Sequence, residues 1–190
     1  MTCGSIPCAD GAARTPRGSV AKILAAPKWQ VLASLILIAC CCGQMRAAHA
    51  DSLARATAAY ARGDYVRAVN TLTPLALRGN ADAQAFLGFM YENGFGAPQA
   101  YDAAADFYIQ AAIRGNPFGQ GMLGLMYDKG HGVPQGVILA YKWLNLAAGR
   151  APKRQREYFL RLRNAVASKM SPVQIAEGQH LALLWAPGQP

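Results

Sequence analysis

Small and apolar residues recur along this chain with a period of 36 residues. The run from Leu87-Gly88 to Tyr91 returns as Leu123-Gly124 to Tyr127, and the spaced glycines and the Pro-Gln pair that follow also return. A period of this length is typical of a solenoid, in which each unit buries its apolar face only against its neighbours. The sequence therefore predicts a repeat protein.

Each repeat predicts a pair of helices. Residues 81–93 have helical composition, and Gly94 and Gly96 then end the helix and turn the chain. The alanine-rich segment 101–114 predicts a second helix that ends at Gly115. The unit is thus an antiparallel helix hairpin with a loop of about seven residues.

Two glycines stand in the middle of the predicted first helices. Gly88 and Gly124 occupy equivalent repeat positions. Glycine inside a helix costs about 1 kcal/mol relative to alanine, so we expect a packing reason. A side chain at either position would push the paired helix away.

Flanking segments extend the repeat in both directions. Residues 51–80 predict a degenerate hairpin with a shortened loop, before full repeats at 81–116 and 117–152. Residues 153–190 predict two basic capping helices, of which the second opens with a capping box at Ser171. The fold expected is an all-α solenoid with C-terminal capping helices.

The first fifty residues predict an export signal. Basic residues lead into an apolar run from Trp29 to Gly43, and Ala48-His49-Ala50 matches a signal-peptidase site, so cleavage is expected after Ala50. The run is shorter than the roughly 18 to 20 residues that span a bilayer. A retained anchor and a lipoprotein acylated at Cys40 remain as alternatives to a periplasmic or secreted protein.

Cysteine usage agrees with export. All five cysteines lie in the leader, so residues 51–190 can form neither a disulfide framework nor a thiolate zinc site. A chain without thiols suits an oxidising compartment.

Charge is unevenly distributed around the net value of +9. Residues 51–149 hold seven basic and seven acidic residues, whereas residues 150–190 hold seven basic and two acidic ones. The basic C-terminal helices could touch anionic lipid or cell-wall polymer, although a solvated face explains them more simply. No nucleic acid partner is expected outside the cytoplasm.

Catalytic and cofactor patterns are weak. Residues 119–124 spell G-x-G-x-x-G but lack the preceding strand of a dinucleotide site. His131 and His180 have no metal-ligand spacing, and Glu92 and Asp128 are equivalent repeat positions rather than a distinct acid and base. We therefore expect no enzyme activity, metal or cofactor.

Residues 51–152 resemble the Sel1-like repeat family, relatives of tetratricopeptide repeats with the pattern A-x-A-Q-x-x-L-G-x-x-Y-x-x-G-x-G-V. Gln84 and Gln120 occupy its glutamine position, and Trp143 its second-helix tryptophan. The chain departs from the pattern at Ala100, Gly119, Gly121 and Gly136. The resemblance implies a non-catalytic protein-interaction scaffold, often of the bacterial envelope.

The tetratricopeptide hairpin implies a concave binding surface on the first helices. Its groove positions transfer to an apolar floor with an acidic rim, which suits an extended or helical peptide with apolar anchors and basic flanks. The alternative is that helix 81–93, apolar nearly all round, is buried under the C-terminal helices. The candidate binding residues are Asp82, Phe89, Glu92, Phe118, Leu125 and Asp128.

Two other functions remain as alternatives to a scaffold that binds a partner protein or peptide. Some relatives regulate a membrane sensor kinase from the periplasm. Others, rich in cysteine, suggest a hydrolase of cell-wall or β-lactam substrates, but their paired cysteines are absent here.

Overall fold

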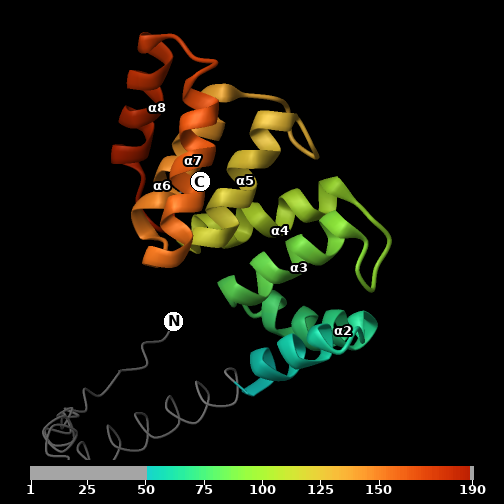
Figure 1. Ribbon diagram of the computed structural model, residues 1–190. Coiled ribbons are helices and arrows are strands. Elements are labelled where there is room, and N and C mark those ends of the chain that lie inside the picture. Colours follow the sequence, from blue (N-terminus) through green and yellow to red (C-terminus); the bar gives the residue numbers. More distant parts are fainter. Residues whose placement is uncertain (1–50, 189–190) are drawn as a thin grey trace, which may run out of the picture. The chain divides into compact units, whose positions relative to one another are not determined.

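The computed structural model describes residues 51–188, and these fold into helices without strands (Figure 1). The predicted leader, with its cleavage site and Cys40, falls outside the described residues. None of the described helices is long and apolar enough to cross a membrane. After a first helix over residues 51–61, the helices are α2 (Tyr65–Leu77), α3 (Ala81–Asn93), α4 (Tyr101–Ile113), α5 (Pro117–Lys129), α6 (Val137–Arg150), α7 (Lys153–Ala167) and α8 (Pro172–Leu184).

The two complete repeats begin and end their first helices in the same way. Asn80 caps α3 and Asn116 caps α5, each through a side-chain oxygen that accepts a backbone N–H. Gly94 and Gly130 end these helices with φ of 70° and 72°, a left-handed conformation that suits glycine. Local chemistry therefore sets the hairpin that the repeat pattern predicts.

The mid-helix glycines allow the close helix approach expected of them. A Cβ at Gly88 would lie 2.7 Å from Cδ1 of Tyr108 on α4. A Cβ at Gly124 would lie 2.8 Å from Cγ of Leu144 on α6. The packing expectation for both glycines is confirmed.

Buried glutamines tie each repeat to the one before it. Gln84 on α3 donates from Nε2 to the carbonyl oxygen of Ala76 at 2.9 Å, and Gln120 on α5 donates to Ala112 at 3.2 Å. Both acceptors lie near the C-terminal end of the preceding helix, where each also accepts a backbone N–H, from Gly79 and Gly115 respectively. The glutamine of the repeat pattern thus adds a hydrogen bond that links α3 or α5 to the end of the preceding helix.

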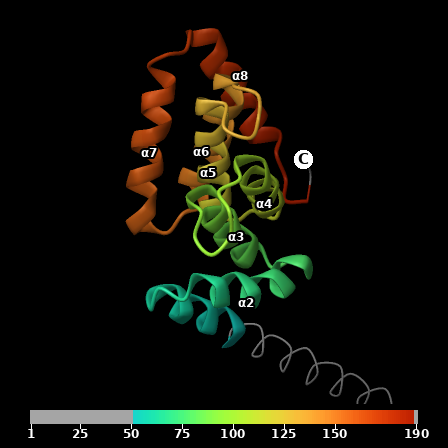
Figure 2. The same ribbon diagram turned by 90° about the vertical axis from the view of Figure 1, so that its right-hand side faces the viewer.

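The two C-terminal helices both pack against α6 and lie on opposite sides of it (Figure 2). Helix α7 begins 36 residues after α5. It packs against α6, the helix before it, just as α5 packs against α4. It therefore continues the series of first helices, which we call the A helices: residues 51–61, α3, α5 and α7.

Helix α8 departs from the repeat geometry. It lies along α6, where a Cβ at Gly178 would come within 2.8 Å of Cδ1 of Tyr141. Beyond its end, Trp185 packs edge-on against Trp143, with ring centroids 6.0 Å apart. The predicted capping box of Ser171 and Gln174 is present at its start. Helix α8 thus covers the outer side of α6 as a cap.

Candidate binding surface

An open, apolar hollow lies on the A helices. Its volume is about 430 Å³, and it spans the helix over residues 51–61, α3 and the start of α5. We call it the aromatic hollow because four of its lining side chains are aromatic. The lining residues are Tyr60, Asp82, Ala85, Phe86, Phe89, Asn116 and Phe118.

Phe89 stands at the centre of these rings. Its centroid lies 6.1 Å from Tyr60 and 6.4 Å from Phe118, both in edge-on geometry. Phe86 precedes it by three residues on the same face of α3 and lies 5.2 Å from Tyr60. Edge-on aromatic packing stabilises ring clusters beyond the area that they bury. Each ring of the hollow therefore packs against at least one other.

Three of the six candidate binding residues come together at this hollow, namely Asp82, Phe89 and Phe118. Leu125, Glu92 and Asp128 are not among the residues that line it. Phe89 is partly exposed, and it also packs against two of the core clusters. Phe89 was expected to lie either in a groove or in the core. In the structure it does both: one part of the ring lines the hollow and another packs against the core.

The acidic residues predicted as a rim already have partners within the fold. Oδ1 of Asp82 accepts a hydrogen bond from Nδ2 of Asn116 at 2.7 Å, which joins the starts of α3 and α5. Oε2 of Glu92 accepts from the hydroxyl of Tyr108 at 2.8 Å, within one hairpin.

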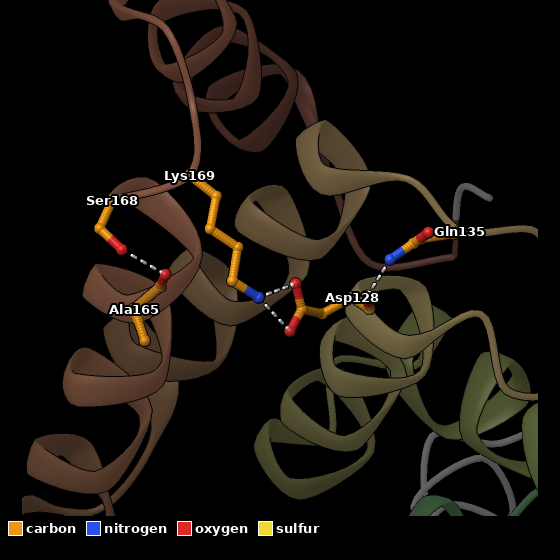
Figure 3. A network of polar contacts seen from close by, with 5 residues as sticks. All are labelled: Asp128, Gln135, Ala165, Ser168 and Lys169. Atoms are coloured by element: carbon orange, nitrogen blue, oxygen red, sulfur yellow. Dashed lines mark hydrogen bonds and ion pairs between the residues drawn. The ribbon is translucent and has the colours of Figure 1, made fainter.

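Asp128 binds the C-terminal cap rather than facing a groove. Nζ of Lys169, in the turn between α7 and α8, lies 2.9 Å from Oδ1 and 3.0 Å from Oδ2 of Asp128 (Figure 3). The backbone oxygen of Asp128 also accepts from Gln135 at 2.8 Å. Of these three acids, Asp128 alone is paired with a cation among residues 51–188, so Asp82 keeps its negative charge beside the aromatic rings of the hollow.

Tyr108 is a buried, neutral hydrogen-bond donor. Burial raises its pKa well above the usual range, and the negative charge of Glu92 raises it further. Gly88 makes room for the ring, so one small residue and one acid together position this hydroxyl.

Two aromatic side chains that line the hollow, Phe86 and Tyr60, were not predicted from the sequence. Phe86 lies four residues after Asp82 and three before Phe89, so helical spacing already placed it on the same face. Tyr60 gave no such signal, because the shortened loop of the first hairpin, residues 62–64, breaks the 36-residue register before α2.

The remaining candidate chemistry is accounted for by packing. Residues 119–124 lie inside α5, where a Cβ at Gly119 would come within 2.7 Å of Cβ of Ala111. The ring of His131 lies 4.6 Å from that of Tyr101. Within residues 51–188, no three His, Cys, Asp or Glu side chains group as metal ligands.

The pattern of the Sel1 repeat matches residues 81–116 and 117–150. The chain thus contains two consecutive Sel1 repeats. Sel1 repeat proteins generally act as scaffolds for protein–protein interactions, and the repeat is typically a non-catalytic fold. No curated protein matches the chain.

Two solved structures share the fold. One is a protective antigen of uropathogenic Escherichia coli with an SLR fold, at TM-score 0.66 and 22% identity, over 72% of this chain and 29% of that one. The other is a Sel1 repeat protein from Oxalobacter formigenes, at TM-score 0.56 and 22% identity, over 70% of this chain and 56% of that one. The chain therefore spans only part of the length of both proteins.

Proposed function

We propose that this protein is a non-catalytic interaction scaffold of the bacterial envelope, which binds a partner peptide or protein at the aromatic hollow. The observation that carries the proposal is the cluster of partly exposed rings on three successive A helices. Aromatic side chains are enriched among the residues that dominate binding energy in protein interfaces.

The shape of the hollow favours a bulky apolar anchor on the partner. Ala85 contributes only a methyl group between the larger side chains of α3 and α5, which gives the hollow its depth. The ring contacts hold the walls before any partner arrives, so little conformational entropy is lost on binding.

The envelope location is supported by the leader pattern of residues 1–50 and by the absence of cysteine from residues 51–190. It is a separate part of the proposal, because the hollow would bind its partner by the same contacts in any compartment.

Site-specific photocrosslinking in the native host tests the binding surface. A photoreactive phenylalanine analogue replaces Phe86 at the hollow or Val173 on α8, which is 76% exposed. We expect a discrete crosslinked product from position 86 and none from position 173. A product at both positions, or at neither, would count against the hollow.

A substitution with a matched control then gives the energetic test. Phe86→Ala should weaken binding of the crosslinked partner by about 2 kcal/mol or more, as truncation of an aromatic hot spot does. Leu183→Ala, at an 85% exposed position on α8, should leave binding unchanged. Circular dichroism of both variants checks that the helices are retained.

A further inference from the structure

The first hairpin separates its charges in space. Residues 51–80 contain four arginines and two aspartates as their charged residues. All four arginines line one furrow of about 420 Å³ between the helix over residues 51–61 and α2, and neither aspartate lines it. We call this the arginine furrow. Its lining residues are Ser52, Arg55, Ala58, Arg62, Arg67, Thr71, Pro74, Leu75 and Arg78.

Helical spacing places the guanidinium groups on both walls. Arg62, directly after the first helix, is two turns from Arg55, and Arg78, directly after α2, is about three turns from Arg67. The short turn that joins the helices makes them run antiparallel, so the two pairs face the same furrow.

Part of the furrow's floor is apolar. Leu75, which is 4% exposed and belongs to the core, lines it together with Pro74 and Ala58, which are exposed. Charge interactions are stronger beside low-dielectric protein than in bulk water, so an anion held against this floor would be bound more tightly than one on a flat surface.

Carboxylates of the hairpin do not neutralise these arginines. Within residues 51–188, the ion pair present is that of Lys169 with Asp128, at the other end of the repeats. Oδ1 of Asp64 accepts from the backbone N–H of Arg67 as the cap of α2. Nη2 of Arg55 donates to Oγ of Ser52, a neutral partner that leaves the positive charge uncompensated.

A polar end face alone does not explain this arrangement. The terminal unit of a solenoid needs a polar outer face, which a mixture of both charge signs supplies with less mutual repulsion. Four like charges around one furrow repel one another unless an anion lies between them.

We propose that the arginine furrow binds the phosphate of an anionic ligand, which is either a compound with at least two phosphate groups or a phosphate ester. Guanidinium groups present parallel N–H donors that match the oxygens of phosphate in bidentate fashion. The same chemistry is offered by a small soluble polyphosphate and by the headgroup of an anionic phospholipid. The furrow lies on a different surface from the aromatic hollow, so this proposal does not depend on the partner bound there.

Calorimetric titration of the purified protein with inorganic pyrophosphate at low salt provides the first test. We expect saturable binding that weakens as salt is added. The double variant Arg55→Gln with Arg67→Gln removes one guanidinium from each wall and should weaken binding at least tenfold. The matched control, Arg154→Gln with Arg161→Gln, removes the same charge from exposed positions of α7 and should leave binding unchanged.

Co-sedimentation with vesicles identifies the source of the phosphate. Vesicles of phosphatidylcholine mixed with phosphatidylglycerol are compared with pure phosphatidylcholine vesicles, using the same variants. Loss of binding in the furrow variant but not in the control, with either probe, supports the proposal. Failure of both probes to bind, or an equal loss in the two double variants, would overturn it. Thermal unfolding of each variant confirms that the fold is intact.

Discussion

Phe159 occupies the space that a side chain at position 121 would need. A Cβ added to Gly121 on α5 would overlap the ring of Phe159 on α7, and that ring is only 1% exposed. The glycine that departs from the repeat pattern is therefore the position at which the capping helix packs against the second repeat.

Gly121→Ala should lower the free energy of unfolding by about 1–3 kcal/mol, because it overpacks this contact. Gly149→Ala is the matched control, since an added Cβ there has no neighbour within 4 Å. Gly149→Ala should leave the free energy of unfolding unchanged or raise it by up to about 1 kcal/mol. Urea unfolding measures both variants, and equal stability of Gly121→Ala and wild type would contradict the contact.

A second variant tests whether the destabilisation by Gly121→Ala comes from its contact with Phe159. Phe159→Leu removes part of the ring and should make Gly121→Ala less costly than in the wild-type background. The two substitutions share one space, so their effects should not add. Additive effects would place the cause of destabilisation elsewhere in α5.

Much of this fold could be predicted because its signals are local. Asn80 and Gly94 bound α3 by short-range chemistry, and the 36-residue period then carried the same hairpin to α5 and α6. The partner of Gly121 could not be predicted in this way, because Phe159 lies on another helix and 38 positions further along the chain.

The candidate site was predictable only where it follows the repeat. Helical spacing placed Asp82 and Phe89 on one face, and both line the hollow. The repeat equivalence also predicted Asp128 on the rim of the groove. Its carboxylate instead pairs with Lys169, which lies in the C-terminal cap outside the repeat pattern. Equivalent positions share a backbone geometry and differ in what the rest of the chain brings to them.

Tyr108 should make stability fall at high pH. Burial and the neighbouring charge of Glu92 raise its pKa above the ordinary value of 10.0. Below about pH 10 the phenol is protonated in both states, so the stabilisation is fully present. Above that pH the unfolded chain loses the proton while the folded protein keeps it, which costs about 1.4 kcal/mol for each pH unit.

Denaturant unfolding between about pH 8 and about pH 11 measures this slope. Tyr108→Phe should remove that part of the pH dependence and also lower stability at neutral pH by about 1–3 kcal/mol, because Glu92 loses its donor. Tyr158→Phe, on an exposed tyrosine of α7, controls for the change of residue type. An identical slope for Tyr108→Phe and wild type would show that Tyr108 titrates normally.

Export predicts a shorter chain in the native host. Signal-peptidase cleavage after Ala50 would leave a protein that begins at Asp51. Intact-mass measurement of the purified protein should give that species. A full-length protein in the cytoplasm would rule out export, and a lipid-modified Cys40 would favour a lipoprotein instead.

Phe89 should contribute to both stability and binding, because its ring is partly exposed in the hollow and packs against two core clusters. A fully buried phenylalanine costs roughly 3–5 kcal/mol when truncated to alanine. We expect Phe89→Ala to cost less, about 1–3 kcal/mol of unfolding free energy, and to weaken partner binding by about 2 kcal/mol or more.

Leu123→Ala is the core control, since Leu123 is 1% exposed and should cost about 2–5 kcal/mol. Urea unfolding gives the stability of both variants, and the yield of crosslinking from position 86 reports binding in the Phe89→Ala background. If Phe89→Ala proves as destabilising as the core control, the ring belongs to the core and the hollow is closed in solution. If it changes neither stability nor crosslinking, the partner still contacts position 86 but Phe89 contributes nothing to binding, and the prediction for Phe89 is wrong.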